Sequence, residues 1–333
     1  MNINFRHAAV ATLAASVAVL AGCGGSGSGE TGTTGFLSLA VSDSPIHDAK
    51  KVCITFNAIE LKSGSNTEVL DLVNDFGGAQ TVNLLDFQGD DSTLILGNVE
   101  VLAGDYQWMR LDIDAVLGGD GGADENGDSG EDTCDGGGSY MVMTGGSVHN
   151  LYVPSSAQNG LKLVGGFTVP LNGAANFTAE WDLMKSVTAP AGLARDVVMK
   201  PVIRLVNNVE VGTLTGLVAT DLATAISETE GACEPSVFVF NDGVTPNPDG
   251  IDDDPNSTAV DPDDAVATAM VAEQQNADGL MTWNYTVGFL LEGNYEAAFT
   301  CDDGQSFEPV TGKEANITRN QTTTVDFQVP PPE

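Results

Sequence analysis

Short runs in which apolar and polar residues alternate recur along most of the chain. The run GFLSLAVSDSP, which begins at Gly35, alternates until an Asp-Ser-Pro turn, and VCITFN, which begins at Val52, alternates in the same way. A period of two is typical of a half-buried β-strand, and clusters of Gly, Asn, Asp and Pro between such runs mark turns. The pattern predicts an all-β protein built as antiparallel sandwiches or barrels.

One strand in this pattern carries a candidate binding surface. The segment TLILGNVEVLAGDYQWMRLDIDAV predicts two strands joined by a Leu-Ala-Gly-Asp turn. Strict alternation in the second strand places Tyr106, Trp108, Arg110 and Asp112 on one face. Tyr106 and Trp108 are therefore a candidate stacking platform for a sugar ring, although most aromatic side chains of a small sandwich are needed in its core.

The blocks GFLSLAVSDSPIHDAKKVCITFNAIEL, TVNLLDFQG, GDYQWMRLDID, GLKLVGGFTVP, FTAEWDLMKSV and MKPVIRLVNN follow one another between residues 36 and 208. In this order they resemble the domain of unknown function 4382 (DUF4382), which is found in envelope proteins. The resemblance implies a β-fold and an envelope setting, and it brings no activity and no catalytic residues. We expect this domain to span residues 36–209.

A new strand pattern begins at NNVEVGTLTGLV, so we expect a second domain over residues 210–329 and a solvated tail over 330–333. GTLTGLVAT, VFVFNDG and GFLLEGNYEAAFTC resemble the strands of small carboxypeptidase-regulatory or transthyretin-like sandwiches. In that family a Gly-x-Tyr turn precedes a late strand, as Gly293 and Tyr295 do here. Both domains are thus expected to be Ig-like or prealbumin-like sandwiches. The segment AVATAMVAEQQNA predicts the one short helix.

The first 22 residues have the features of a lipoprotein signal peptide. Arg6 makes the start positive, and the apolar stretch from Ala8 to Ala21 is shorter than the about 20 residues that span a bilayer. The following Leu-Ala-Gly-Cys sequence resembles a lipobox, which implies diacylglycerol on Cys23. Gly at position 24, where Asp would signal retention, implies the outer membrane. Residues 23–35 predict a flexible Gly/Ser tether.

Charge and cysteine content restrict the partners and the compartment. The chain holds 12 Lys and Arg against 47 Asp and Glu, a formal net charge of −35, which argues against nucleic acid and anionic lipid headgroups. The four cysteines after Cys23 predict two disulfides in an exported protein. Three pairings are possible, and the expected domain boundary favours Cys53 with Cys134 and Cys233 with Cys301. Metal thiolate sites usually need closely spaced cysteine pairs, which the sequence lacks.

Two acidic loops are candidate calcium sites. In the loop from Gly118 to Gly138 three oxygen ligands stand at the one-three-five spacing of a calcium loop, with an aspartate twelfth in the count. The second loop spans Asn247 to Asp264 and has only fragments of a calcium-binding repeat. The alternative for both loops is a solvated acidic insertion. The candidate ligands are Asp124, Asn126, Asp128 and Asp135 in the first loop and Asn247, Asp249, Asp252 and Asp254 in the second.

Signatures of an enzyme are weak. His47 lies beside Ser44 and Asp48, which suggests a Ser-His-Asp triad, but the segment is better explained as a strand-ending turn. His149 precedes a strand. Glu180 and Asp182 share one strand face, but a glycosidase needs its two carboxylates at a defined separation in a cleft. No nucleophile elbow, zinc-protease helix or phosphate-binding loop is present.

These observations together predict a non-enzymatic lipoprotein of the outer membrane, at the periplasmic face or the cell surface. Its expected role is binding, scaffolding or adhesion at the envelope, with calcium as a candidate stabiliser and no other cofactor. Its expected partners are the membrane, through the lipid, and an envelope protein or polysaccharide. A polysaccharide-binding lipoprotein is the first alternative, and a hydrolase is the second.

Overall fold

The computed structural model describes residues 33–44, 46–47, 49–115, 134, 138–154, 160–188, 196–227, 231–246, 264–276, 278–301 and 306–328. Residues Thr33–Glu333 form one compact unit. Its ordered elements are strands apart from a few single helical turns, so the predicted all-β fold is confirmed. None of the helices in this described part has the length and hydropathy of a membrane span.

The strands up to Asn207 form two sheets that face each other. One sheet has the order β13-β10-β1-β5, and the other has the order β11-β12-β8-β7-β2-β6-β9, with β3 and β4 also paired to β2. Apolar side chains of both sheets, among them Leu39, Phe56 and Met109, meet in one buried cluster, as in a β-sandwich. The bounds are β1 Thr34–Ser44, β2 Ala49–Ser63, β3 Asn66–Asp71, β4 Gln80–Asn83, β5 Thr93–Leu102, β6 Gly104–Ile113, β7 Tyr140–Met143, β8 Val148–Tyr152, β9 Leu161–Val169, β10 Ala174–Asp182, β11 Val187–Thr188, β12 Asp196–Met199 and β13 Ile203–Asn207, with single turns α1 Leu72–Asp75, η1 Leu84–Asp86 and α3 Leu183–Ser186.

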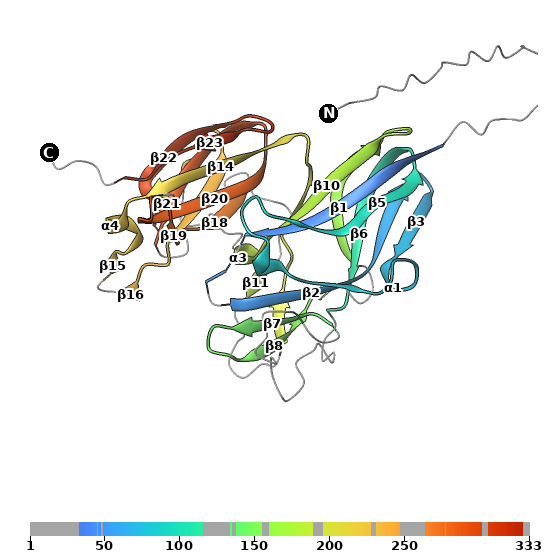
Figure 1. The fold of residues 1–333 in the computed structure, drawn as a ribbon, viewed down its shortest axis with the longest axis horizontal. Coiled ribbons are helices and arrows are strands. Elements are labelled where there is room, and N and C mark those ends of the chain that lie inside the picture. Colours follow the sequence, from blue (N-terminus) through green and yellow to red (C-terminus); the bar gives the residue numbers. More distant parts are fainter. Residues whose placement is uncertain are drawn as a thin grey trace, which may run out of the picture. The chain divides into compact units, whose positions relative to one another are not determined.

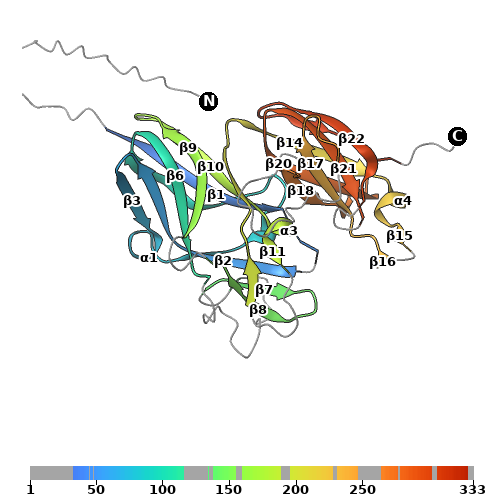
Figure 2. The same cartoon turned by 180° about the vertical axis from the view of Figure 1, so that it is seen from behind.

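Strand β2 organises the larger sheet. It pairs with β6 between Phe56 and Lys62 and with β7 between Ala49 and Cys53, so it continues past the end of β6 (Figures 1 and 2). Apolar residues fill the inward positions of the part that faces β6, for example Ile59 and Leu61, which are fully buried. The residues between them point to the outer face of the sheet, because successive side chains of a strand alternate.

Strand β10 is buried on both faces, which differs from the half-buried strands around it. Phe177, Ala179 and Trp181 are buried on its inner face, and Glu180 and Asp182 on the other face are also buried. β10 pairs in parallel with β1, as β8 does with β12 and β14 does with β23, whereas the other described pairs are antiparallel. Parallel strands usually need cover on both faces, and here that cover encloses two carboxylates.

The strands after Val209 form their own sheets, in the orders β19-β20-β14-β23 and β18-β17-β21-β22, with a small β15-β16 pair. A second buried cluster, which includes Leu214, Val239 and Phe299, joins the two larger sheets. The bounds are β14 Val211–Val218, α4 Thr220–Ala223, β15 Ile226–Ser227, β16 Gly231–Ala232, β17 Ser236–Asn241, β18 Ala267–Met270, β19 Ala272–Gln275, β20 Met281–Leu291, β21 Gly293–Thr300, β22 Glu308–Ile317 and β23 Thr322–Thr324.

The helix expected in AVATAMVAEQQNA does not form, and that expectation was wrong. The segment makes strands β18 and β19. Ala267, Thr268 and Ala269 are all buried, β18 pairs with β17, and β19 pairs with β20. Pairing with neighbouring strands and burial of consecutive side chains outweigh the helix propensity of alanine.

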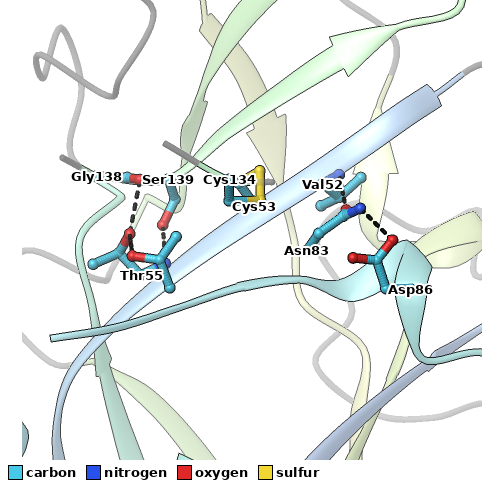
Figure 3. Close-up of a disulfide and its surroundings, with 9 residues drawn as sticks. Val52, Cys53, Thr55, Asn83, Asp86, Cys134, Gly138 and Ser139 are labelled. Carbon is cyan, nitrogen blue, oxygen red and sulfur yellow. Dashed lines mark hydrogen bonds between the residues drawn. A yellow bond between two sulfur atoms is a disulfide. The ribbon is translucent and has the colours of Figure 1, made fainter. Parts of the chain in front are cut away.

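Both predicted disulfides are confirmed, Cys53–Cys134 and Cys233–Cys301. Figure 3 shows the first of them beside β2, where the Thr55 hydroxyl donates to the Gly138 carbonyl at 2.8 Å and the Thr55 amide donates to the Ser139 hydroxyl at 3.0 Å. These contacts fix to β2 the chain segment that follows the first acidic loop. Loop-closure entropy over a separation of 81 residues is worth about 4–5 kcal/mol of stability.

Candidate ligand-binding face

The outer face of β2, β6 and β9 carries two rows of side chains that run across the three strands. In the first row Trp108 on β6 is paired with Lys62 on β2 and with Val164 on β9. In the second row Arg110 on β6 is paired with Glu60 on β2 and with Lys162 on β9. Directly paired residues of neighbouring strands project from the same face of a sheet. We call these six residues, Glu60, Lys62, Trp108, Arg110, Lys162 and Val164, the Trp108 face.

Two cations lie over the Trp108 indole ring. The guanidinium carbon of Arg110 is 4.5 Å from the ring centroid, and the ammonium nitrogen of Lys162 is 5.2 Å from it. Both distances are within the range of cation–π attraction, which favours Trp over other aromatic side chains. The indole ring is partly exposed. Trp108 and the two cations therefore form a flat aromatic and basic cluster that solvent reaches.

The Arg110 side chain is also held by a carboxylate. Its Nη1 donates to Glu60 Oε2 at 2.9 Å, and the two side chains are 24% and 27% exposed. An ion pair with this exposure adds little to stability, because water solvates both partners when they are apart. Its main effect is to fix the orientation of the guanidinium beside the ring.

Among the described residues, the two lysines of the Trp108 face have no acidic partner. Lys62 donates to the Ser65 carbonyl and to the Thr67 hydroxyl, and no described carboxylate lies within ion-pair distance of Lys62 or Lys162. Acidic residues outnumber basic ones by 47 to 12 in this chain. The surface around Trp108 is therefore locally basic, because its two lysines are not neutralised by a described carboxylate, whereas the chain as a whole is strongly acidic.

Acidic character returns at the far end of β6. Burial raises the pKa of the Asp112 carboxyl, and the negative charges of Glu60, Asp114 and Asp71 raise it further. Asp112 follows Arg110 at the next outward position of the same strand. The outer face of β6 thus changes from basic and aromatic around Trp108 to acidic at Asp112.

Tyr106 does not belong to this face, so the predicted Tyr106–Trp108 platform is not formed. Tyr106 is only 3% exposed and stacks on Phe167 with ring centroids 5.0 Å apart. The pairing of β6 with β9 is irregular between Tyr106 and Trp108, and Gln107 and Trp108 both point outward. This irregularity reverses the alternation on which the prediction rested. Burial, with the nearby Glu68 carboxylate, raises the pKa of Tyr106 to about 12.

The carboxylates considered for acid–base catalysis are buried and engaged in the structure. Glu180 forms an ion pair with Arg204, and burial raises the pKa of Glu180 to about 7 even though Arg204 lowers it. Asp182 accepts from the Lys185 amide and from the Thr268 hydroxyl, each at 3.2 Å. A glycosidase needs its carboxylates open to the sugar, and these two are 4% and 7% exposed.

Asp43 lies in the same buried region. It is 1% exposed, and it pairs with Trp181 across β1 and β10. Among the described residues its carboxylate has no side-chain partner, although the backbone amides of Ser44 and Leu183 lie near enough to interact with it. Burial raises the pKa of Asp43 well above its usual value, and the charges of Asp182 and Glu180 raise it further. We call Asp43, Glu180, Trp181, Asp182 and Arg204 the buried acidic region.

The two histidines in the described part of the chain have hydroxyl partners. His47 Nε2 lies 2.9 Å from Ser236 Oγ, and His149 Nε2 lies 3.0 Å from Ser147 Oγ. Ser236 is fully buried, so its hydroxyl is closed to a substrate. Asp48 lies outside the described residues. The triad considered from the sequence is therefore not assembled among the described residues.

Several predicted site residues lie outside the described residues, and the predictions for them stay predictions. They are Cys23, Asp124, Asn126, Asp128, Asp135, Asn247, Asp249, Asp252 and Asp254. Among the residues that are described, no group of three or more His, Cys, Asp or Glu side chains has the arrangement of a metal site.

Sequence reasoning missed Lys62, Lys162 and Val164 as members of the Trp108 face. Alternation in GLKLVGG does indicate which side chains point outward, and the structure agrees: Leu161 and Leu163 are buried, while Lys162 and Val164 are exposed. The sequence does not show that this segment lies beside β6. Only the strand register brings Lys162 to Trp108.

Comparisons with known proteins identify one family and several distant folds. A family model described as a domain of unknown function (DUF4382) matches residues 34–201. No curated protein matches the chain.

Three solved structures illustrate the distant similarity. The minor pilin GBS52 of Streptococcus agalactiae is 12% identical, with 89% of this chain and 98% of that chain covered and a TM-score of 0.18. A putative cell adhesion protein of Bacteroides fragilis is 10% identical, with 87% and 91% covered and a TM-score of 0.20. The Bacillus anthracis TIE protein is 8% identical, with 89% of this chain covered and a TM-score of 0.17, and this chain spans about a third of it, 34%. Similarity at this level carries no argument about function.

Proposed function

Because the chain belongs to the DUF4382 family, whose description assigns no activity, we propose a function from its own surface: a non-enzymatic envelope protein that binds a saccharide on the Trp108 face. The observation that carries the proposal is the partly exposed Trp108 indole with the Arg110 and Lys162 cations over its ring. A sugar would pack on the part of the indole that the two cations leave exposed. An indole face is an apolar plane with negative charge density, and the C–H groups of a sugar ring pack well against such a plane.

The polar members of the face suit a saccharide as well. Glu60 accepts hydrogen bonds, whereas Lys62, Arg110 and Lys162 donate them. Sugar hydroxyls use both kinds of partner. Ligand sites commonly combine one apolar surface with a few fixed polar groups, and the Arg110–Glu60 pair supplies fixed groups beside the ring.

Retention at the envelope is the second part of the proposal. Cys23 would carry the lipid that holds the protein at the outer membrane, and the Gly/Ser tether that follows would display the β-domains as a binding or adhesion module. Full-length protein from membrane fractions should show a diacylglyceryl mass on Cys23 and should enter the detergent phase of Triton X-114. Cys23→Ser should lose both properties, and an unmodified Cys23 in the wild type would contradict the anchor.

The saccharide-binding proposal is tested on a glycan array with the mature protein. Wild type should bind one class of glycan, and Trp108→Ala should reduce that signal at least tenfold. Phe36→Ala is the matched control, because Phe36 is an aromatic residue that is 37% exposed on β1, in the other sheet of the same sandwich. Equal binding by wild type and Trp108→Ala would remove the Trp108 face from the function.

A further inference from the structure

We propose that the ligand of the Trp108 face is an anionic polysaccharide, one whose sugar rings carry carboxylate or sulfate groups. This inference rests on the proposed function and names the chemical class of its ligand. Arg110 is neutralised by Glu60 at 2.9 Å, but Lys62 and Lys162 have no described carboxylate partner. A neutral glycan would leave both ammonium charges uncompensated, whereas an acidic glycan would neutralise them.

The positions of the two lysines fit a chain of sugars. Lys62 lies on β2 and Lys162 lies on β9, on opposite sides of Trp108 on β6. Two strand spacings separate β2 from β9, about 10 Å across the strands. This span is comparable to a disaccharide. A ring over Trp108 would therefore place charged groups of the same polymer within reach of both lysines.

The strong negative charge of the whole chain is compatible with this ligand. At physiological ionic strength charges are screened over about 8 Å, so distant carboxylates act weakly on a polymer in contact with Lys62 and Lys162. Asp112, at the acidic end of the outer face of β6, repels the polymer from that end. The polymer should therefore cross the strands from Lys62 over Trp108 to Lys162 and not extend toward Asp112.

An acidic protein is a poorer fit to the same surface. Stable protein interfaces bury about 800 Å² on each partner around an apolar centre. The described Trp108 face offers one partly exposed indole and Val164, which is 81% exposed, among four charged side chains. A single aromatic plane with charged groups beside it matches the size of a sugar ring better than that of a protein surface.

Isothermal titration of the mature protein against three polymers tests the inference, at 50 mM and 500 mM NaCl with EDTA present. The polymers are polygalacturonate, its fully methyl-esterified form, and poly-L-glutamate, which has carboxylates without sugar rings. Polygalacturonate should bind, and the other two should bind at least tenfold more weakly. The high salt concentration should weaken the binding of polygalacturonate severalfold. Because EDTA removes calcium, bridging of polymer to the acidic loops is excluded.

Two variants locate the interaction. Lys62→Gln with Lys162→Gln should weaken polygalacturonate binding at least tenfold and leave the melting temperature unchanged. Lys50→Gln is the control, since Lys50 is an exposed lysine of the same strand β2, twelve residues or about 40 Å from Lys62. Trp108→Ala should also weaken the binding.

The outcomes separate this inference from the proposed function. If the esterified polymer binds as tightly as the acid, or if the double lysine variant binds like wild type, the anionic ligand is wrong while saccharide binding stands. If poly-L-glutamate binds equally well, the surface recognises charge alone and the inference falls. If no polymer binds, and light scattering shows a dimer that dissociates in the Trp108→Ala variant, the Trp108 face is an interface between two copies of the chain. Both proposals are then wrong.

Discussion

The Trp108 face and the buried acidic region each contain a Glu–Arg pair, in two different environments. Each pair joins neighbouring antiparallel strands, Glu60 with Arg110 in one and Glu180 with Arg204 in the other. Trp108 lies beside its pair, whereas Trp181 projects from the face of β10 opposite Glu180. The arginines are similarly exposed, at 24% and 27%, but the glutamates are 27% and 5% exposed. Burial of the carboxylate is the main difference between the two pairs.

The comparison shows why one region is a candidate site and the other is structural. A carboxylate in solvent remains charged and adapts to a ligand, whereas a buried carboxylate must be neutralised by its neighbours or by a proton. Glu180 shows both responses, because it is paired with Arg204 and its pKa is raised to about 7. The same residue types therefore serve recognition at the surface and constrain the fold in the interior.

Replacement of the two tryptophans should give the largest contrast in stability. Trp181 is fully buried and meets Phe56 edge-on at 6.4 Å, so Trp181→Ala should lower the free energy of unfolding by about 3–5 kcal/mol. Trp108→Ala removes cation–π contacts at a partly exposed site and should lower the free energy of unfolding by under about 1 kcal/mol. Urea denaturation of both variants measures the difference, and equal losses would mean that Trp108 is a core residue.

Replacement of the two arginines should give the next contrast. Arg204→Ala leaves Glu180 buried without its partner. This variant should lower the free energy of unfolding by about 3 kcal/mol at pH 8, where the Glu180 carboxyl is charged in the wild type. Arg110→Ala leaves Glu60 in solvent and should cost under about 1 kcal/mol. The double variant Arg204→Met with Glu180→Leu should recover most of the loss. A similar cost for both single variants would contradict the assigned difference in burial.

The buried acidic region should also impose a pH dependence on stability. The folded pKa values of Asp43 and Glu180 are raised, so the folded state binds these protons more tightly than the unfolded state does. Their stabilising effect is complete below about pH 4, which is the pKa range of these carboxyl groups in the unfolded chain. It is lost as the pH rises through the folded values, which for Glu180 is about 7.

Asp43→Asn should therefore raise the free energy of unfolding at pH 8, because the amide stays neutral in the buried site without binding a proton. Asp112→Asn on the outer face should change it by under about 0.5 kcal/mol, because solvent screens that carboxylate. Urea denaturation between pH 4 and 8 measures both. If Asp43→Asn is destabilised across this range, the wild-type carboxylate has a partner in the folded protein.

The smallest expected effect is the response of the two ion pairs to salt. A double-mutant cycle on Glu60 and Arg110 should give a coupling of about 0.5 kcal/mol at low salt that disappears in 1 M NaCl. The coupling between Glu180 and Arg204 should persist, because solvent ions cannot surround a carboxylate that is 5% exposed. Loss of both couplings in salt would indicate that Glu180 is solvated.

The sequence predicted the features that depend on local pattern. Alternation identified the β-fold, and the expected domain boundary selected Cys53–Cys134 and Cys233–Cys301 from the three possible pairings. Trp108 was recognised as a candidate because alternation in its strand predicts an outward position for it. The prediction for Tyr106 failed because an irregularity in strand pairing cannot be read from alternation alone.

The composition of the site depended on contacts that the sequence does not encode locally. Lys162 comes from a strand more than fifty residues beyond Trp108, and only the register of β6 with β9 places it near the indole ring. The burial of Glu180 and Asp182 was likewise not predictable, because an alternating strand usually has one solvated face. In β10 both faces are covered.

Oxidative footprinting of tryptophan tests the central claim, that the Trp108 face is the ligand-binding surface, most directly. The mature protein is exposed to hydroxyl radicals with and without saturating polygalacturonate, and oxidation of Trp108 is compared with that of Trp283, a partly exposed tryptophan on β20. We predict that the polymer lowers the oxidation of Trp108 severalfold and leaves Trp283 unchanged. Unchanged oxidation of Trp108 in the bound complex would contradict the claim.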